Sequence, residues 1–242
     1  IADVATARYA IEAGVLDLVG MTRALIADPY LPTKIANKTE DQIRPCVGAS
    51  MCIDGIYTAG AAFCIHNPST GRELELPQTI DVAKAKRNVA VVGGGPAGLE
   101  AARTLAEKGH TVTLFEANDS LGGQINIAIR SPRRRDLQGI TDWRTQELKR
   151  LGVAVKLNSY VDASDLSEAG FDAIVVATGG MPKALEIPGG NHVLESWDVL
   201  SGSKRVTGDV LIYDDHGGTQ ALDLAENLAQ SGAKVELVTP ER

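Results

Sequence analysis

The residues best suited to chemistry form a glycine-rich turn between a valine-rich run and a helical pattern. The turn reads Gly93-x-Gly95-x-x-Gly98. In such a turn the first glycine permits a tight bend, the second lets the backbone approach a pyrophosphate, and the third allows close helix–strand packing. Pro96 and Ala97 begin the helical pattern, where free N–H groups attract an anion. The motif therefore predicts a phosphate-binding helix N-terminus.

An acidic residue closes the same unit. Glu116 follows a second apolar run, 112–115, at about the ~20-residue separation where an acid accepts hydrogen bonds from a ribose. Strand, glycine turn, helix and acid together predict a dinucleotide site, and the alternative is a structural βαβ unit with chance glycines. Gly122, Gly123 and Gln124 form a further glycine loop that could pass under the same nucleotide.

Three cysteines lie in a loop-rich stretch. Cys46, Cys52 and Cys64 are spaced C-x5-C-x11-C, and thiolates clustered in this way indicate a metal centre before a disulfide. Iron–sulfur clusters normally take four cysteines, and this chain has three. The spacing alone leaves an iron–sulfur site and a set of buried, inert cysteines equally open. Candidates for a fourth ligand are Ser50, Asp54 and His66.

Apolar strands that alternate with helices must position these residues, which indicates an α/β fold with a parallel sheet. Beyond the glycine turn we expect strands at 153–157, 160–161 and 173–177. Thr178 and Gly179 end the last of these strands.

The first forty residues have a different organisation. We expect a helix over 1–13, a short strand over 16–19 that leads to Arg23, and then a proline-punctuated helix. This order is typical of the last units of a (β/α)8 barrel, where a ligand phosphate often binds. Arg23 is either the bidentate partner of that phosphate or a surface arginine. Because the chain opens on Ile1 in mid-helix, we expect it to be part of a longer protein.

Residues 209–240 repeat the pattern of residues 88–116. Asp214 and Asp215 end the first strand of the repeat, where a phosphate would approach. At an effective dielectric of ~20, two like charges 4 Å apart repel by ~4 kcal/mol. We therefore predict that the fold is kept and the second dinucleotide site is lost. In an overlay on the shared Leu-Ala pairs, His216, Gly218, Ala221 and Thr239 fall on Gly93, Gly95, Gly98 and Glu116.

Composition excludes several classes of protein. The 242 residues are 44% hydrophobic and carry a net charge of -7, which argues against a nucleic-acid partner. There is no secretory signal, and no apolar run approaches the ~20 residues of a membrane span. We therefore expect a cytoplasmic protein with no membrane partner, and a homodimer is the default assembly.

The chain resembles the trimethylamine dehydrogenase and 2,4-dienoyl-CoA reductase family in GMTRALIADPYLPTKIAN, IRPCVGASMC, HNPSTGRE, VAVVGGGPAGLEAARTLAEKG, LGGQ and IVVATGG. In this family an old-yellow-enzyme-like FMN barrel of the NADH:flavin oxidoreductase type is fused to a glutathione-reductase-like module. The resemblance covers nearly the whole chain. It implies a barrel tail over 1–40, an iron–sulfur and linker segment over 41–76, a three-layer Rossmann-like FAD- or ADP-binding domain over 77–200, and the start of a degenerate nucleotide-binding domain over 201–242.

The resemblance also implies roles for particular residues. Arg23 would lie near the FMN phosphate, and a [4Fe-4S] cluster would use Cys46, Cys52 and Cys64. The family pattern is C-x2-C-x2-C-x11/12-C, and Ala49 stands where the second cysteine belongs. The cluster would then use a non-cysteine ligand, contain three irons or be absent. Residues expected to contact FAD or ADP are Gly93, Gly95, Pro96, Ala97, Gly98, Glu116, Gly122, Gly123, Gln124, Val161 (near the adenine), Thr178 and Gly179.

The activity that the resemblance implies is oxidation of a secondary or tertiary amine, by a dehydrogenase or demethylase that passes electrons to an electron-transfer flavoprotein. The expected loss of the second dinucleotide site favours an amine dehydrogenase, because such an enzyme takes its electrons from its substrate and needs no pyridine nucleotide. An NADPH-dependent dienoyl-CoA or enoate reductase is the first alternative, and it needs a working second site. A redox-inert ADP-binding docking module is the second. The substrate pocket and its catalytic residues would precede Ile1.

Overall fold

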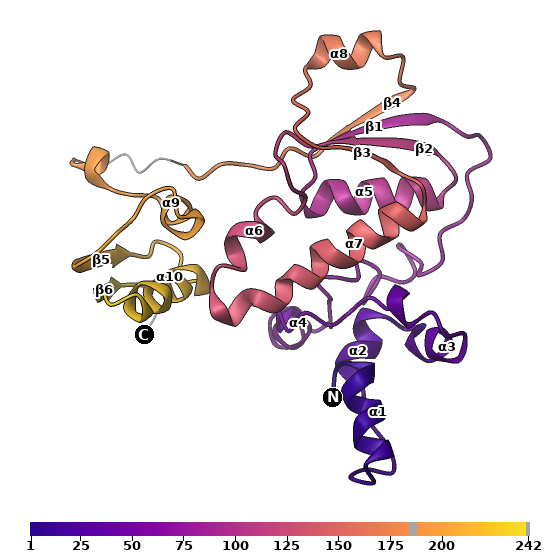
Figure 1. Ribbon diagram of the computed structural model, residues 1–242, viewed down its shortest axis with the longest axis horizontal. Helices are drawn as coiled ribbons and strands as arrows, with labels where there is room; N and C mark the ends of the chain where they lie inside the picture. The colour runs from indigo at the N-terminus through magenta and orange to yellow at the C-terminus, as the bar shows by residue number, and fades with distance from the viewer. Residues whose placement is uncertain (184–187, 241–242) are drawn as a thin grey trace. The chain divides into compact units, whose positions relative to one another are not determined.

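The computed structural model describes residues 1–183 and 188–240, which form two compact units (Figure 1). Unit 1 comprises Ile1–Gly123 and Leu137–Thr178. Unit 2 comprises Gln124–Asp136 and Gly179–Arg242. The four segments expected from the family resemblance divide the chain differently, and they stay a prediction.

A parallel sheet forms the centre of unit 1. Its strands are β1 (Asn88–Val92), β2 (Thr111–Phe115), β3 (Ala154–Lys156) and β4 (Ala173–Val176), in the order β3-β2-β1-β4. Every neighbouring pair is parallel, so the carboxyl ends of β1, β2 and β4 meet at one edge. The expected α/β fold with a parallel sheet is confirmed.

Helices lie on both faces of this sheet (Figure 1), but the second face is covered only in part, because Ile174 and Val176 of β4 are 44% and 73% exposed. Helices α5 (Pro96–Glu107) and α7 (Gln138–Arg150) pack on one face. On the other face, Leu166 of α8 (Ala163–Glu168) packs on Ala90 and Phe115. Successive side chains of a strand point to opposite faces, which explains why nearly all of β1 is apolar. The core under α5 and α7 contains Val91, Leu99, Ala102, Val112, Leu114 and Leu148.

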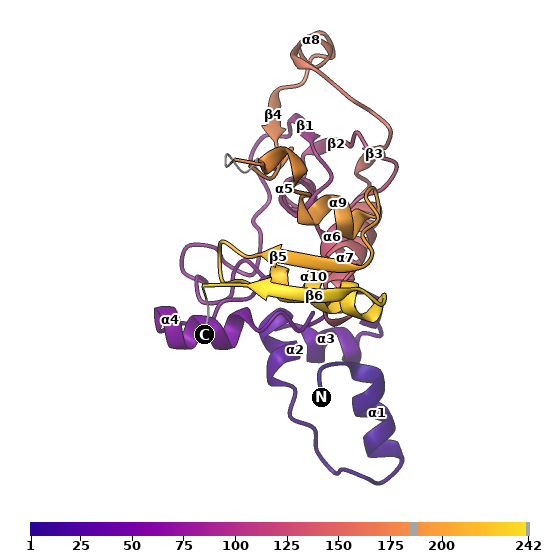
Figure 2. The same cartoon turned by 90° about the vertical axis from the view of Figure 1, so that its left-hand side faces the viewer.

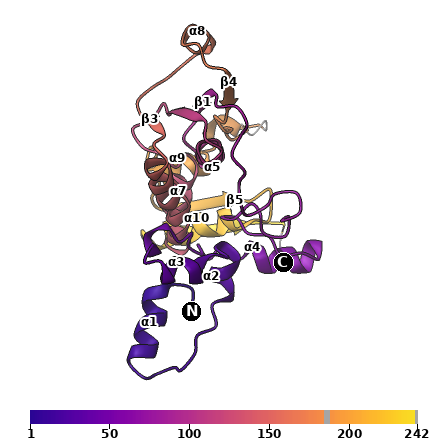
Figure 3. The same cartoon turned by 90° about the vertical axis from the view of Figure 1, so that its right-hand side faces the viewer.

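Short helices precede the sheet (Figure 3). Asp3 caps the first helix through Thr6 N–H, and Ala7 and Ala10 are its buried residues. The helix expected over 1–13 is therefore confirmed, with shorter bounds. These elements are α1 (Val4–Glu12), α2 (Thr22–Ala27), α3 (Leu31–Ala36), the 3-10 turn η1 (Glu40–Gln42) and α4 (Met51–Ala59).

Two expected strands are wrong. Residues 16–19 are irregular, and Leu18 is 87% exposed, because no strand among the described residues lies beside them to accept hydrogen bonds. Residues 160–161 are irregular and do not extend the sheet. Ser159 N–H donates to Glu116 O, and Asp162 then caps α8, so the segment crosses from β3 to the helix.

Unit 2 contains a two-stranded parallel sheet made of β5 (Asp209–Tyr213) and β6 (Lys234–Val238), with α10 (Thr219–Gln230) packed against it (Figure 2). The strand–helix–strand repeat is confirmed. Its core contains Ile212, Ala221, Leu224 and Leu228. The other elements of this unit are α6 (Ile125–Ala128), the 3-10 turn η3 (Gly190–His192) and α9 (Ser196–Ser201), and the 3-10 turn η2 (Pro132–Leu137) ends at the start of α7.

The arginine run before α7 pairs with α10 within unit 2. Arg133 Nε donates to Glu226 at 2.5 Å, and Arg134 Nε donates to Asp223 at 2.9 Å. Arg135 is exposed. In residues 1–183 and 188–240, none of the helices is long and apolar enough to cross a bilayer.

Candidate nucleotide-binding site

Two glycines of the first turn are required by the packing of the protein itself. Gly93 has φ +107°, and a Cβ there would lie 2.3 Å from Ala177 O. A Cβ on Gly98 would lie 1.8 Å from Gly93 O. A larger residue at either position would push the turn away from β4 or from α5.

Gly95 differs, because the protein leaves room beside it. A Cβ at this position would meet only Gly123 Cα, at 4.0 Å. Gly95 is the N-cap of α5 with no side-chain cap, Pro96 follows at the first helical position, and Ala97 is exposed. An uncapped helix N-terminus with open space beside it can accept an anion through its N–H groups and its dipole.

Glu116 lies directly below this turn and is 6% exposed. Its Oε2 accepts a hydrogen bond from Gly94 N–H at 2.6 Å, and its Oε1 accepts from Asn118 N–H and Nδ2 at 2.8 and 2.9 Å. A carboxylate offers about four lone-pair sites, so one acceptor position is left for a hydroxyl donor. Asn118 was not predicted from the sequence, although an amide two residues after the acid is a local signal.

The second glycine loop lies against the first turn. Gly122 N–H donates to Gly94 O at 2.9 Å, and a Cβ on Gly123 would be 3.0 Å from Gly95 Cα. The loop thus borders the open side of Gly95.

The other expected nucleotide contacts are more dispersed. Val161 packs on the α8 side of the sheet, with the cluster around Phe115. Thr178 is exposed at the end of β4. Gln124 and Gly179 belong to unit 2, where Gln124 Nε2 donates to Gly180 O at 3.1 Å. The roles of all these residues at a nucleotide stay predictions.

The turn of unit 2 matches that of unit 1 at its helix but is longer. Residues 93–95 join β1 to α5, whereas residues 214–218 join β5 to α10. Gly218 is an uncapped N-cap like Gly95. Ala221 and Thr239 occupy the places of Gly98 and Glu116, as expected.

The expected overlay of His216 on Gly93 is wrong. Asp214 N–H donates to Val238 O at 2.8 Å, just as Gly93 N–H donates to Phe115 O. Asp214 therefore occupies the place of Gly93. The sequence overlay allows no gap, whereas the extra residues of this repeat lie in the turn.

The carboxylate of Asp214 accepts hydrogen bonds from the turn that joins β5 to α10. It is 8% exposed, and its Oδ1 accepts from the N–H groups of His216 and Gly217, both at 3.1 Å. Its Oδ2 accepts from Thr239 Oγ1 at 2.9 Å. The hydrogen bond from the His216 amide, with those from Thr239 and Gly217, lowers the pKa of the Asp214 carboxyl below its ordinary value. The N-terminus of α10 itself is uncapped, but the charge of this carboxylate in the turn before it would repel an incoming phosphate.

The cysteines are free thiols, and all three are half-buried. His66 N–H donates to Cys64 Sγ at 3.4 Å. Within the described parts of the chain, no three His, Cys, Asp or Glu side chains converge as a site for a single metal ion. Three cysteines, with Ala49 in place of a fourth, do not complete the donor set of a four-thiolate cluster.

The three candidates for a fourth ligand of an iron–sulfur centre differ in their exposure to solvent. Ser50 and Asp54 are exposed. His66 is fully buried, its Nδ1 lies 2.9 Å from Pro45 O, and its ring packs edge-on against Trp143 at 5.3 Å between centroids. Burial, together with the charge of nearby arginines, lowers the pKa of His66 to about 3, so the ring is neutral.

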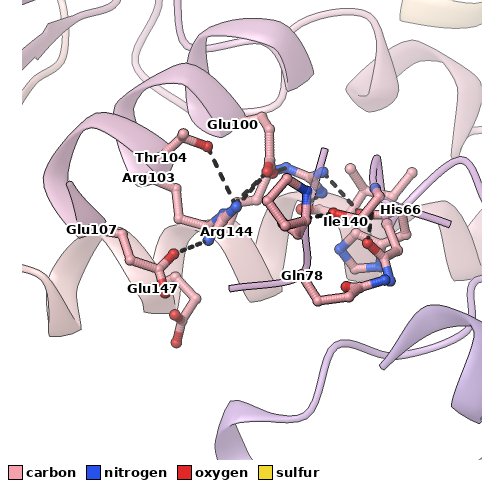
Figure 4. Close-up of polar contacts among 12 residues, drawn as sticks. His66, Gln78, Glu100, Arg103, Thr104, Glu107, Ile140, Arg144 and Glu147 are labelled. Carbon is pink, nitrogen blue, oxygen red and sulfur yellow. Dashed lines mark hydrogen bonds and ion pairs between the residues drawn. The ribbon is translucent and has the colours of Figure 1, made fainter. Parts of the chain in front are cut away.

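A network of arginines and glutamates ties the cysteine segment to the nucleotide fold (Figure 4). Arg103 Nη2 and Arg144 Nε donate to the two oxygens of Glu100, at 2.6 and 2.9 Å. Arg144 Nη2 also donates to His66 O at 3.2 Å, and Trp143 Nε1 donates to Gln42 O at 3.0 Å. Burial alone would raise the pKa of Glu100, but the hydrogen bond and charge of Arg103, with the charge of Arg144, outweigh it and lower that pKa.

Arg23 lies exposed in the first turn of α2. Its expected contact with an FMN phosphate stays a prediction.

The parallel sheet and the glycine turn at the start of α5 are features of a dinucleotide-binding fold. Comparison with known protein families leads to the same class of protein. The family model described as "Pyridine nucleotide-disulphide oxidoreductase" matches residues 87–242. The chain belongs to this family.

Two curated relatives narrow the identification. The chain is 49% identical to a probable N-methylproline demethylase from Rhizobium meliloti (strain 1021), a match that covers 100% of this chain and 36% of that protein. It is 46% identical to a multifunctional alkene reductase/demethylase from Caballeronia cordobensis, over 98% of this chain and 34% of that protein. The chain thus spans about a third of the length of these relatives.

A solved structure agrees with them. The chain superposes with a TM-score of 0.89 and 36% identity on the 6-hydroxypseudooxynicotine amine oxidase of Pseudomonas geniculata N1, over 96% of this chain and 37% of that one. The expected resemblance to amine-oxidising and reductase flavoenzymes is confirmed.

Proposed function

We propose that this chain is the nucleotide-binding and electron-transfer portion of a flavin-dependent amine dehydrogenase or demethylase. Its substrate would be a secondary or tertiary amine of the N-methyl amino acid or methylamine type. The names of two relatives, a demethylase of N-methylproline and an amine oxidase, support this substrate class.

The observation that carries the proposal is the contrast between the two glycine turns. In unit 1 the N-terminus of α5 is uncapped, and space is open beside Gly95. In unit 2 the carboxylate of Asp214 already accepts the N–H groups of its turn. One site can take a pyrophosphate and the other repels it, so electrons enter from an amine and not from a pyridine nucleotide.

FAD or ADP fits the first turn. The N–H groups at the start of α5 would hold the pyrophosphate, Glu116 would accept from a ribose hydroxyl, and Gly123 would border the phosphates. FAD would supply electron transfer when bound, whereas ADP would serve only as an anchor. In either case the role of the protein is to bind and orient the nucleotide.

Further parts of the proposal rest on the family resemblance. FMN would bind in the barrel, with Arg23 at its phosphate. Cys46, Cys52 and Cys64 are proposed ligands of an iron–sulfur centre that is not a four-cysteine cluster. An electron-transfer flavoprotein would accept the electrons, and we propose a cytoplasmic homodimer.

The experiment that tests the nucleotide site is identification of the nucleotides released when the intact protein is denatured. We expect an adenine nucleotide, FAD or ADP, in one-to-one ratio with the chain. Iron and sulfide analysis of the same sample measures the cluster. Release of no adenine nucleotide would show that the turn around Gly95 is structural only.

A second candidate function has one observation in its favour. The Caballeronia cordobensis relative is named for alkene reduction as well as demethylation. An NADPH-dependent reductase would require the turn of Asp214 to open, and rapid flavin reduction by NADPH distinguishes it from an amine dehydrogenase.

A further inference from the structure

A polar cavity of about 220 Å³ lies in unit 1, away from the glycine turn. It is bordered by the second half of α5, by α7 and by the loops on either side of the cysteine segment. Arg103 lies more than ~10 Å from Gly95 along α5, at ~1.5 Å per residue, so the cavity is separate from the nucleotide site. The basic residues that line it are Lys34, Arg44, Arg103 and Arg150.

Three of these four cations have a carboxylate partner. Lys34 Nζ lies 2.6 Å from an oxygen of Asp28. Arg150 Nη2 lies 2.6 Å from an oxygen of Glu147. Arg103 pairs with carboxylates on its own helix, Glu100 at 2.6 Å and also Glu107. The acidic groups of the lining are therefore already engaged.

Arg44 is the exception. Its guanidinium stacks over Trp143, with 4.4 Å between its central carbon and the ring centroid. Its backbone N–H donates to Asp28 at 2.8 Å, but within residues 1–183 and 188–240 its guanidinium has no hydrogen-bond acceptor and no ion-pair partner. Nε of Arg44 is fully buried. Arg44 as a whole is half-buried, and a charge that is partly removed from water without a partner is destabilising, for which the usual remedy is a counter-ion.

We propose that this cavity, the Arg44 cavity, binds a small oxyanion, a carboxylate or a phosphate group, that pairs with the Arg44 guanidinium. The planar fork of an arginine matches both kinds of oxyanion with two parallel hydrogen bonds. Trp143 stacks against the guanidinium and fixes its plane, and because Lys34 and Arg150 are already paired, the charge of Arg44 is the one left for an anion. The volume suits a phosphate ion or a short carboxylic acid and is below the usual range of larger cofactor sites.

The test is calorimetric titration of the intact protein with sodium phosphate and, separately, with sodium acetate, at ionic strength held constant with sodium chloride. We expect saturable binding of at least one anion, weakened by about tenfold or more in Arg44→Met. Arg135→Met is the matched control, because Arg135 is exposed and lies in unit 2, and it should bind as the wild type does. Preference for phosphate or for acetate identifies the source of the oxyanion, and either preference supports the site.

Thermal unfolding separates this role from a structural one. In chloride buffer, Arg44→Met should unfold at a midpoint no lower than the wild type, because it removes an unpaired, half-buried charge. Added phosphate or acetate should raise the midpoint of the wild type and not that of Arg44→Met. The proposal is overturned if neither anion binds the wild type, if Arg44→Met binds equally well, or if Arg44→Met loses stability in chloride and the anions have no effect.

Discussion

At the scale of single residues, the glycines of the first turn are glycines for different reasons. Gly98 is required by the protein, since a Cβ there would lie 1.8 Å from Gly93 O. Gly95 has room for a Cβ, so the protein itself does not require glycine there. We expect the requirement to come from the pyrophosphate of a bound nucleotide. The sequence motif predicts all three positions but cannot separate these reasons, because they depend on contacts made only after folding.

This difference gives a paired prediction. Gly98→Ala should lower the free energy of unfolding by about 3 kcal/mol, because overpacking forces α5 away from the turn. Gly95→Ala should cost no more than about 1 kcal/mol, the usual penalty of alanine at an N-cap, yet release most of the bound adenine nucleotide. Urea unfolding and nucleotide content measure the two effects.

Gly180→Ala is the matched control, since a Cβ there meets nothing within 4 Å. Its stability and nucleotide content should equal those of the wild type. Full nucleotide content in Gly95→Ala would mean that no pyrophosphate approaches this residue.

At the scale of elements, hydrophobic periodicity predicts the strands and helices of the nucleotide-binding fold. It does not predict which residues far apart in the sequence contact each other. The strand–helix–strand units and the repeat in unit 2 follow from local pattern. The strand expected over 16–19 fails because strands need neighbours, and the longer turn at Asp214 is missed because an ungapped overlay cannot place an insertion. The contacts of Arg144 with Glu100 and His66 join segments far apart in the chain. Only the spacing of Glu100 and Arg103 on one helix offers a local signal.

The Glu100 network predicts a pH-dependent effect on stability. Glu100→Gln should lower the free energy of unfolding by about 3 kcal/mol at neutral pH, because it leaves Arg103 and Arg144 without their shared carboxylate. The pKa of Glu100 is lowered from its ordinary value of 4.5. Its contribution is therefore complete above that value and is lost as the pH falls through the lower pKa of the folded state. Urea unfolding of wild type and variant across acid pH measures the difference.

The matched control is Glu168→Gln, an exposed glutamate at the end of α8. It should change stability by less than about 0.5 kcal/mol at every pH. A wild-type advantage over Glu100→Gln that stays constant into strong acid, or that is absent at neutral pH, would refute the role given to Glu100.

At the scale of the whole molecule, the two units differ in their glycine turns. Unit 1 keeps an open glycine turn, and unit 2 keeps the fold of a nucleotide domain while Asp214 fills its turn. The relatives are about three times as long as this chain, and the proposed function places amine oxidation outside these residues. Under the proposed function, this chain would contribute the adenine-nucleotide site.

The direct test of this division is anaerobic mixing of the oxidised intact protein with an N-methylated amino acid, such as N-methylproline, or with NADPH, while flavin absorbance is recorded. We predict rapid and stoichiometric bleaching by the amine and no comparable bleaching by NADPH. Rapid, stoichiometric bleaching by NADPH would contradict the claim that the turn of Asp214 excludes a pyridine nucleotide, and would assign the protein to the reductases instead.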